Sequence, residues 1–285
     1  MVFIWGSTWM AIKVSVGNTP FYLAGIRFFL AACMLIIIQR VRGRAIFPTR
    51  ENMKVILAIG LGNFFLGYGF TYWGMQFVES NVTSILWATL PVMVTITAHF
   101  KLKDEKINLA KIFSLVGSLV GTFFIFDIGG HDFDPQVALG MAFILVSIFA
   151  AAFSNVIYKR DGSHLDPLSI NIAGMLVGAS LLILVGLVTE PWMAVDYTML
   201  RVGATVYLAM FGSAMSFSIY FWLLKRISVV KMSYSTFLIP ILAGIWGWVI
   251  LGESLSSKSM LGAAIILLAV SLPELKIFKR NRTNG

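Results

Sequence analysis

Residues 80–105 read SNVTSILWATLPVMVTITAHFKLKDE: a small polar opening, an apolar run that Pro91 interrupts, and a charged end. Residues 229–253 follow the same plan in the sequence VVKMSYSTFLIPILAGIWGWVILGE, with Pro240 inside the apolar run and an acidic residue at the end. Internal similarity of this kind indicates that one structural unit occurs twice. The two stretches therefore predict a helical unit that is present once in each half of the chain.

The composition is typical of a membrane protein. Of the 285 residues, 58% are hydrophobic and only 12% are charged. A soluble protein of this length has too little interior to bury that much apolar surface, so the expected solvent is a lipid bilayer. The net charge of +9 would otherwise suggest nucleic acid, but the positive residues lie in short loops between apolar runs. We therefore expect no nucleic-acid partner.

The sequence gives no sign of a metal site, a disulfide or a cofactor site. Cys33 is the single cysteine, which excludes a disulfide within the chain and a cysteine-based metal site. His99, His131 and His164 are far apart in the sequence and fall at the ends of apolar runs or in loops. We therefore expect neither a bound metal nor a cofactor.

Apolar runs long enough to cross a bilayer recur along the whole chain. Backbone groups in lipid must pair within their own segment, so each run is expected to be helical. The first run lacks the basic region and cleavage site of a signal peptide. At ~1.5 Å per residue it covers about 24 Å of a ~30 Å core, so we expect a late helix start or residues that precede it. Ten runs lie near residues 2–16, 20–38, 55–75, 82–100, 110–126, 137–157, 167–188, 203–223, 230–250 and 259–273.

Lys and Arg are concentrated in alternate loops, and this bias predicts the orientation of the chain. We expect both termini in the cytoplasm and the chain in the inner (plasma) membrane. The basic loops and the tail hold Arg40, Arg42, Arg44, Arg50, Lys54, Lys101, Lys103, Lys106, Lys111, Lys159, Arg160, Lys225, Arg226, Lys231, Lys276, Lys279, Arg280 and Arg282. The opposite loops hold Arg201 and Lys258 with the acidic residues Glu79, Asp127, Asp132, Asp134, Glu190, Asp196 and Glu253.

The two halves of the chain match in more than one place. Pro20 and Pro167 each begin the second apolar run of their half, and Pro91 and Pro240 each interrupt the fourth. Five spans in each half require the second half to lie upside down relative to the first. We therefore predict an all-α integral membrane protein with ten transmembrane helices in two inverted five-helix repeats. The repeats are residues 1–127 and 137–275, and residues 276–285 form a basic cytoplasmic tail. Many secondary transporters have this architecture, with the substrate site near the midplane between the repeats.

Short motifs in four of the spans are shared with a known family. They are Trp5-Gly6-Ser7-Thr8-Trp9 with Lys13, Leu23-Ala24-Gly25-Ile26-Arg27-Phe28, Thr89-Leu90-Pro91 with Glu105, and Pro240 with Gly252-Glu253. In these motifs and their order the chain resembles the EamA-type transporters of the drug/metabolite transporter superfamily. The resemblance implies a ten-helix inverted-repeat exporter, often of amino acids or other small metabolites. The chain departs from the family in its short first span and its polar loop at residues 101–106. In the second half, Asn155 and Lys159 stand where a Trp-Gly-Ser motif would fall.

Two ionisable residues, Lys13 and Arg27, lie inside predicted spans, where a charge is costly and therefore suggests function. Lys13 is close to the end of its span and either snorkels to the interface or touches the substrate. Arg27 lies about two helical turns into its span and either ties span ends together through backbone carbonyls or attracts a substrate carboxylate. No Asp or Glu falls in the middle of a span. This disfavours proton antiport, and a facilitator, or coupling through a group at a span end, fits at least as well.

Aromatic and polar residues inside the spans are candidates for a substrate cavity, which is usually apolar with a few polar groups. Asn63 and Asn155 either line this cavity or bond across helices for modest stability, ~0.6 kcal/mol on average. The cavity candidates are Trp5, Trp9, Asn63, Tyr68, Tyr72, Trp87, Ser154, Asn155, Tyr220 and Tyr234. Aromatic residues near span ends are expected to be interfacial anchors. These anchors are Trp73, Tyr158, Trp192 and Trp222.

Pro91 and Pro240 remove a backbone donor and bend their helices. Each bend is either a static kink or a hinge for alternating access, with the freed carbonyls near Trp87 and Thr236 facing the cavity. Small residues in the fifth and tenth spans are expected to pack helices together. They are Gly117, Ser118, Gly121, Gly262, Ala263 and Ala269.

The function that these features favour is a secondary transporter. It would export a small organic metabolite, such as an amino acid or a related compound, by alternating access around an aromatic-lined cavity. Its partners would be the solute and the lipid bilayer. The alternative is a non-transporting membrane scaffold or receptor, which the inverted repeat disfavours. An intramembrane enzyme would need a nucleophile–base pair or clustered His and Asp at membrane depth, and the spans contain no such pair.

Overall fold

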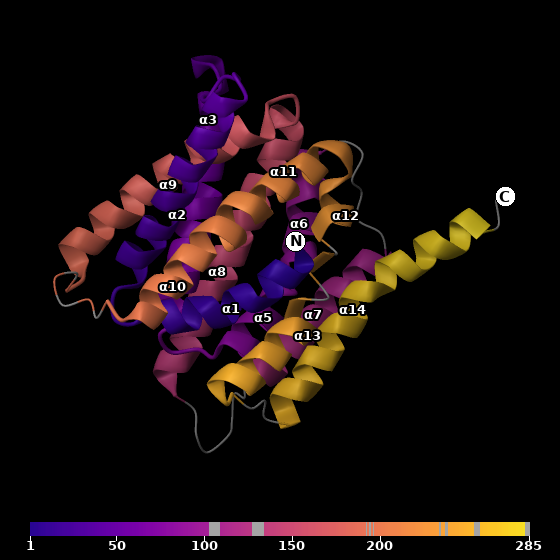
Figure 1. Ribbon diagram of the computed structural model, residues 1–285. Helices are drawn as coiled ribbons and strands as arrows, with labels where there is room; N and C mark the ends of the chain where they lie inside the picture. Colours follow the sequence, from indigo (N-terminus) through magenta and orange to yellow (C-terminus); the bar gives the residue numbers. More distant parts are fainter. Residues whose placement is uncertain are drawn as a thin grey trace.

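The structure is a computed structural model, and every element that it describes is a helix. It describes residues 1–102, 109–126, 134–191, 193, 195, 197–233, 235–236, 239–253 and 257–282. Within these ranges there is no strand, and the helices lie against one another in a bundle (Figure 1).

The helices of the first half follow the first five predicted runs. α1 (Val2–Val16) and α2 (Pro20–Val41) are single helices. The third run is one continuous helical segment with a π-helix in its centre, and the fourth is divided in two. The remaining parts are η1 (Arg50–Asn52), α3 (Met53–Leu57), η2 (Ala58–Tyr68), α4 (Gly69–Gly74), α5 (Ser80–Trp87), α6 (Leu90–Lys101) and α7 (Leu109–Phe126).

The helices of the second half follow the same order. The eighth run again has a π-helix in its centre, and the ninth is again divided. The parts are α8 (Pro135–Ile157), η3 (Tyr158–Gly162), α9 (Pro167–Thr189), α10 (Met199–Tyr207), η5 (Leu208–Met215), α11 (Ser216–Arg226), α12 (Val229–Ser233), α13 (Ile239–Trp246), η7 (Gly247–Leu251) and α14 (Ser257–Arg282). α14 thus continues beyond the predicted span at residues 259–273 into the predicted tail.

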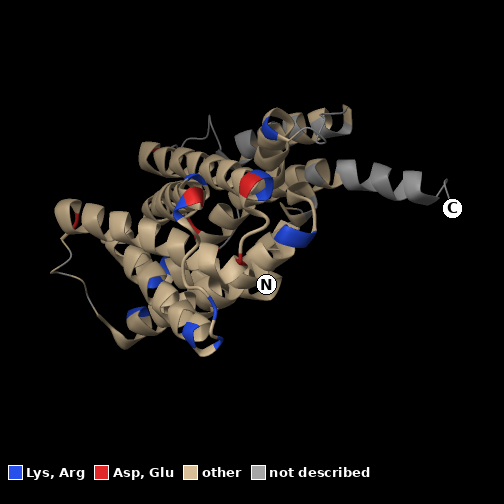
Figure 2. Ribbon diagram, turned by 90° about the horizontal axis from the view of Figure 1, so that it is seen from above, with Lys and Arg blue, Asp and Glu red and all other residues tan. Residues whose placement is uncertain are grey.

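Helix length and composition fit a chain that crosses a membrane many times. Among the described residues, six segments are long and apolar enough to span: Pro20–Val41, Arg50–Gly74, Ser80–Lys101, Pro135–Gly162, Pro167–Thr189 and Met199–Arg226. Val2–Val16, Ile239–Leu251 and Met260–Ala269 are shorter apolar helices. Figure 2 shows long stretches of ribbon that carry neither Lys, Arg, Asp nor Glu.

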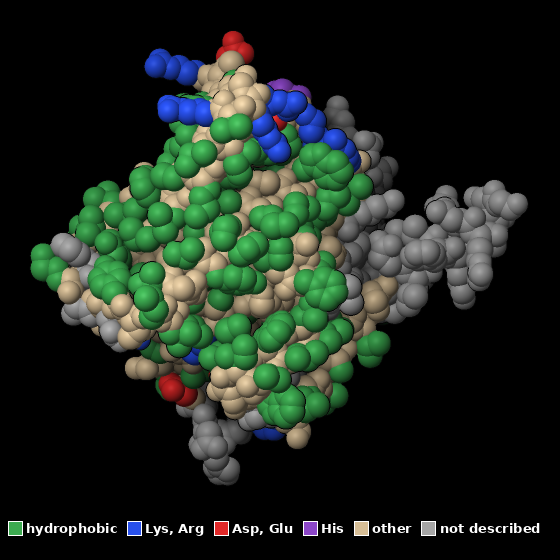
Figure 3. Space-filling view, in the orientation of Figure 1, with side chains coloured by type: hydrophobic (Ala, Val, Ile, Leu, Met, Phe, Trp, Pro, Cys, Tyr) green, Lys and Arg blue, Asp and Glu red, His purple; other side chains and the backbone are tan. Residues whose placement is uncertain are grey.

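We name the two ends of the bundle after the ends of α2. At the Pro20 end α1 finishes and α5 and α8 begin, and at the Val41 end α6 and α11 finish and α9 begins. Most of the Lys and Arg side chains visible in Figure 3 gather at the top, which is the Val41 end. Beneath them lies a broad band of hydrophobic side chains, which suits contact with lipid.

The two prolines of the repeated stretches lie in the first turn of a helix. α5 ends at Trp87 and α6 begins at Leu90, so Pro91 occupies an early position whose missing N–H is not needed. Pro240 follows Ile239, the first residue of α13. The first run is therefore interrupted just before Pro91, and the second leaves the α-helical conformation at residues 235–236, ahead of Pro240.

Glycines bring α2 and α9 into close contact. A Cβ placed on Gly25 of α2 would lie 2.6 Å from Ile183 Cγ1, and one on Gly186 of α9 would lie 2.6 Å from the backbone N of Tyr22. Small residues allow helix backbones to approach closely, and this packing drives helix association in lipid.

α7 and α14 form a second closely packed pair. A Cβ on Gly117 would lie 2.5 Å from the Cβ of Ala269, and one on Gly121 would lie 2.7 Å from the carbonyl oxygen of Gly262. The predicted packing role of these four residues is confirmed.

Candidate functional site

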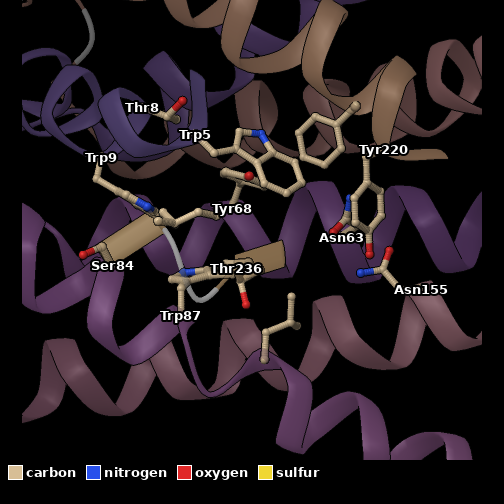
Figure 4. Close-up of a pocket in the computed structure, with 13 residues that line it drawn as sticks. Trp5, Thr8, Trp9, Asn63, Tyr68, Ser84, Trp87, Asn155, Tyr220 and Thr236 are labelled. Atoms are coloured by element: carbon tan, nitrogen blue, oxygen red, sulfur yellow. The ribbon is translucent and has the colours of Figure 1, made fainter. Parts of the chain in front are cut away.

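A buried cavity lies inside the bundle, between α1, η2, α5, α8 and α11. The free space has a volume of about 30 Å³, enough for roughly two water molecules. Figure 4 shows Asn63, Asn155 and Tyr220 at one end and Trp9, Ser84 and Trp87 at the other. Among the described residues, the lining is Trp5, Thr8, Trp9, Asn63, Tyr68, Ser84, Trp87, Leu90, Asn155, Phe217, Tyr220, Thr236 and Ile239.

Aromatic rings form the walls of the cavity. The ring centroid of Trp5 is 5.4 Å from that of Tyr220 and 5.7 Å from that of Phe217. The ring centroids of Trp9 and Trp87 are 5.5 Å apart. Rings at such distances are in contact. These contacts must separate before a solute of more than a few atoms can enter.

Five buried polar atoms on the cavity lining have no hydrogen-bond partner. Trp5 Nε1, Trp9 Nε1 and Asn63 Nδ2 are donors, Asn155 Oδ1 is an acceptor, and the Tyr220 hydroxyl is both. Leaving a buried polar group unpaired costs about 1–3 kcal/mol, and such groups in a native structure need an explanation. Their concentration in one cavity makes it the candidate site for a polar ligand.

Trp87 differs from the other two cavity tryptophans because its indole is paired within the protein. Its Nε1 donates to Thr71 Oγ1 at 3.3 Å, and the Thr71 hydroxyl donates to the Gly67 carbonyl at 2.7 Å. Trp87 therefore offers a ring to the cavity but no free donor.

The cavity contains most of the residues that the sequence predicts for it. Seven of the ten candidates line it: Trp5, Trp9, Asn63, Tyr68, Trp87, Asn155 and Tyr220. Tyr72 and Ser154 lie elsewhere. The Tyr72 hydroxyl accepts a hydrogen bond from Arg27 Nη1 at 3.2 Å, and Ser154 Oγ donates to the Ala151 carbonyl at 3.0 Å. Tyr234 is outside the described residues.

Six lining residues are absent from the predicted set. They are Thr8, Ser84, Leu90, Phe217, Thr236 and Ile239. Ser84 and Phe217 lie three residues before Trp87 and Tyr220, and this spacing places residues on the same helical face. Spacing from a predicted aromatic residue is therefore the signal that would have found these two.

The predicted interfacial anchors divide into different environments. Trp222 is 47% exposed, and the guanidinium carbon of Arg226 lies 3.7 Å from its ring centroid, which fits an anchor. Trp73 is partly buried. Tyr158 is fully buried, so its prediction as an anchor is wrong: helix packing encloses it although it lies near the end of its span. Trp192 is outside the described residues.

Arg27 is completely buried, with 0% of its surface exposed. Its Nε donates to Ser213 Oγ at 2.7 Å, and its Nη2 donates to the Gly212 carbonyl at 3.3 Å. With the bond to Tyr72, these contacts join α2 to α4 and η5. The guanidinium carbon also lies 5.1 Å from the ring centroid of Tyr68, a cavity residue. None of these partners carries a charge.

Lys13 binds backbone carbonyls at the Pro20 end. Its Nζ donates to the carbonyl of Met75 at 2.7 Å and to that of Val78 at 2.9 Å. These carbonyls follow the end of α4, so the lysine ties α1 to the connection between α4 and α5. Lys13 does not line the cavity.

Lys159 makes the equivalent contacts at the Val41 end. Its Nζ donates to the carbonyl of Leu224 at 2.9 Å and to that of Ile227 at 2.8 Å. These two carbonyls, like those that Lys13 binds, are three residues apart and lie at the end of a helix that is followed by a divided run. The two lysines thus perform the same task at opposite ends.

Glu253 belongs to the second half of the chain and caps α5, the first helix of the divided run in the first half. The backbone N–H groups of Ser80 and Asn81 donate to its carboxylate at 2.9 Å and 3.1 Å. Carboxylates satisfy the free donors at a helix N-terminus and interact favourably with its dipole. Burial raises the pKa of the neighbouring Glu79, and the charge of Glu253 adds to this rise, while Asn81 and Lys13 oppose it.

Glu190 caps α2 in the same way. The N–H groups of Phe21 and Tyr22 donate to its carboxylate oxygens at 2.7 Å and 2.9 Å. Burial raises the pKa of Glu190, and the two backbone hydrogen bonds oppose the rise. Two carboxylates of the second half thus complete helices of the first half at the Pro20 end.

Comparison with known proteins places this architecture among transporters. The EamA-like transporter family matches the chain twice, over residues 1–127 and 138–273. The transporter YoaV of Bacillus subtilis (strain 168) is 31% identical over 271 residues, which cover 94% of this chain and 91% of that protein. The inner membrane transporter YedA of Escherichia coli (strain K12) is 28% identical, with 94% of this chain and 86% of YedA covered.

More distant proteins are similar in sequence or in fold. A chloroplastic WAT1-related protein of Arabidopsis thaliana is 26% identical over 95% of this chain and 66% of its own length. A solved crystal structure with 18% sequence identity superposes with a TM-score of 0.73 over 96% of this chain and 93% of that chain.

A bundle of membrane-length helices around a buried cavity that mixes aromatic and polar groups is the arrangement of a membrane transporter. The chain belongs to the EamA-like transporter family. It is accordingly a multi-pass membrane protein.

Proposed function

We propose that the protein is a secondary transporter of the inner membrane that moves a small organic metabolite, an amino acid or a related compound. The observation that carries this proposal is the cavity with five unpaired polar atoms. A scaffold has no need to keep such costly groups together inside aromatic walls, whereas a carrier needs groups that pair with a solute. The resemblance to family exporters supports outward transport.

The architecture that we propose is a ten-helix inverted repeat. The equivalent bonds of Lys13 and Lys159 at opposite ends of the bundle support this arrangement. So does the match of one family to the two halves in turn. In such carriers the two repeats rock against each other around a site between them.

The orientation that we propose places the Val41 end in the cytoplasm, with both termini on that side. Positive residues favour cytoplasmic loops. Those at the Val41 end are Arg40, Arg42, Arg44, Arg50, Lys54, Lys101, Lys159, Arg160, Lys225 and Arg226. The Pro20 end of the described structure has Lys13, Arg201 and Lys258 beside four acidic residues, Glu79, Asp134, Glu190 and Glu253.

The mechanism that we propose is alternating access with hinges at the two divided runs. The space of about 30 Å³ is too small for a metabolite, so the aromatic walls must separate toward one side at a time. The interruptions before Pro91 and Pro240 allow α5 and α12 to move relative to α6 and α13.

Counterflow in proteoliposomes tests the proposal. Purified protein is reconstituted into proteoliposomes that are loaded with unlabelled amino acids, organic acids or organic amines. Uptake of the labelled compounds is then followed with and without a pH gradient. We expect saturable exchange of one class and a loss of exchange in Asn63→Ala. The control Asn52→Ala changes an amide at the Val41 end that bonds to Thr49, and should leave exchange unchanged. Absence of saturable flux from folded protein would favour the scaffold or receptor.

A further inference from the structure

We propose that the solute carries an anionic group, most simply a carboxylate, and that the buried guanidinium of Arg27 provides its counter-charge. The inference rests on the proposed transport function and adds the charge class of the substrate. It follows from the neutral surroundings of Arg27, from its position behind the cavity wall, and from the polar groups that the wall presents.

The charge of Arg27 has no counter-charge in the described part of the protein. A guanidinium remains protonated in proteins, and a buried charge is costly unless it is paired. The hydrogen-bond partners of Arg27 are two hydroxyls and one carbonyl. The ion pairs of the described residues involve other arginines, Arg44 and Arg160. A positive potential therefore persists inside the bundle, and a charge at this depth marks a solute path by default.

Arg27 lies one layer of side chains behind the cavity wall. The Tyr68 ring over which its guanidinium lies also lines the cavity. On the other side, a Cβ on Gly212 would meet Arg27 Nη2 at 3.2 Å and Thr8 Oγ1 at 3.3 Å. The guanidinium and the Thr8 hydroxyl, which lines the cavity, therefore approach the same point. Entry of a solute requires the aromatic walls to separate. This movement would leave less side-chain material between the solute and Arg27.

The polar groups of the wall also favour an anion. The indoles of Trp5 and Trp9 donate hydrogen bonds and cannot accept them, and both lack a partner. The described lining residues include no Asp or Glu, so a cationic solute would find no counter-charge among them and would be repelled by Arg27. At the end of the cavity away from Trp9, Asn155 and Tyr220 offer acceptors to a donor elsewhere on the solute.

Three compounds of similar size and different charge test the inference. They are phenylacetate, phenylacetamide and phenethylammonium, which share an apolar ring suited to aromatic walls. Binding of labelled phenylacetate to purified protein in nanodiscs is measured, with each unlabelled compound as competitor. An opposite unit charge one layer of side chains away in a protein interior changes the affinity on the order of tenfold or more. We therefore expect phenylacetate to compete at least tenfold better than the amide, and phenethylammonium to compete least.

Two variants assign the preference to Arg27. Arg27→Gln should reduce the advantage of phenylacetate over the amide to less than threefold. Arg27→Lys keeps the charge and should keep the preference for the anion, although its hydrogen bonds differ. Size-exclusion profiles and thermal transitions show whether each variant is folded. The comparison in the unmodified protein decides the charge class even if Arg27→Gln does not fold.

Several results would overturn the inference. They are equal or better competition by the amide or the ammonium compound, no binding of phenylacetate, or an unchanged preference in folded Arg27→Gln. Saturable counterflow of a solute that carries no anionic group would overturn the charge class and leave the transport function standing. Absence of flux for every solute would contradict the transport function itself.

Discussion

The rings of Trp9 and Trp87 are in contact in the cavity, but only the indole N–H of Trp87 has a hydrogen-bond partner. Trp87 donates to Thr71, whereas the indole N–H of Trp9 is unpaired. The same residue type therefore serves two purposes. The Trp87 donor stabilises the folded protein, and the Trp9 donor is available to a ligand.

Replacing each of these tryptophans with phenylalanine should separate the two purposes. Trp9→Phe keeps a ring and removes a donor, so the affinity for the transported solute should fall roughly three- to tenfold while the thermal transition stays the same or rises slightly. Trp87→Phe removes a satisfied hydrogen bond and should lower the stability by about 1 kcal/mol. Affinity from competition binding and thermal transitions in detergent measure the two effects. An unchanged affinity in Trp9→Phe would show that its donor does not meet the solute.

Gly25 illustrates how helix contacts depend on single residues at the scale of an element. A helix interior normally favours Ala over Gly by about 1 kcal/mol. At Gly25, however, the added Cβ would lie 2.6 Å from Ile183 Cγ1 and 2.9 Å from the backbone N of Ile183. The backbone of α9 cannot yield as a flexible side chain does.

Gly25→Ala should therefore destabilise the protein by about 1–3 kcal/mol, in the range of overpacked cores. Gly203→Ala is the matched control, because a Cβ on Gly203 of α10 meets nothing within 4 Å. It should be neutral or raise the thermal transition slightly. Thermal unfolding of the two variants in the same detergent makes the comparison. Equal transitions would mean that α2 and α9 adjust to the added methyl group.

Much of the element order follows from the sequence, because apolar runs and prolines are strong signals in a membrane protein. The faces of the helices are harder to predict, since lipid, protein and cavity all accept apolar side chains. Tyr68 and Tyr72 are four residues apart, which would place them on one face of a regular α-helix. Both rings do lie beside Arg27, whose guanidinium carbon is 5.1 Å from the ring centroid of Tyr68 and 5.9 Å from that of Tyr72, but a shared face does not specify which side chain reaches the cavity. Tyr68 lines the cavity while Tyr72 binds Arg27.

Asn155 and Ser154 show a second limit at this scale. Both are polar, adjacent in the sequence and buried, yet only Asn155 reaches the cavity. Neighbouring residues on a helix point in different directions, and the sequence does not specify the rotation of an apolar helix. Arg27 is a similar case, since its partner Ser213 lies far away in the chain.

At the scale of the whole molecule, Lys13 and Lys159 hold helical segments together at opposite ends of the bundle. Each amine holds two carbonyls at the end of one helical segment, and each lies at the opposite end of the bundle from the other. In a carrier that opens to one side at a time, removing one of these ties should favour opening at that side.

Lys13→Met and Lys159→Met should therefore shift accessibility in opposite directions. The single cysteine, Cys33, is first replaced with alanine, and Ser84→Cys then places a thiol on the cavity lining. A membrane-impermeant maleimide is applied from each side of oriented vesicles. We expect Lys13→Met to speed labelling several-fold from the Pro20 end and Lys159→Met to speed it from the Val41 end.

Lys54→Met provides the control for a lost positive charge, because Lys54 is exposed at the Val41 end. Its labelling rates should equal those of the unmodified background. If Lys13→Met and Lys159→Met accelerated labelling from the same side, the two ties would not control opposite openings.

The caps formed by Glu190 and Glu253 have a consequence for the order in which the chain is made. α2 and α5 belong to the first half, but the carboxylates that bind their first N–H groups come from the second half. During synthesis the first half leaves the ribosome before either of these carboxylates has been made. α5 receives its carboxylate only after residue 253 has been made. The first half therefore cannot complete these hydrogen bonds until the second half has been made. The protein folds as one unit although its sequence contains two similar halves.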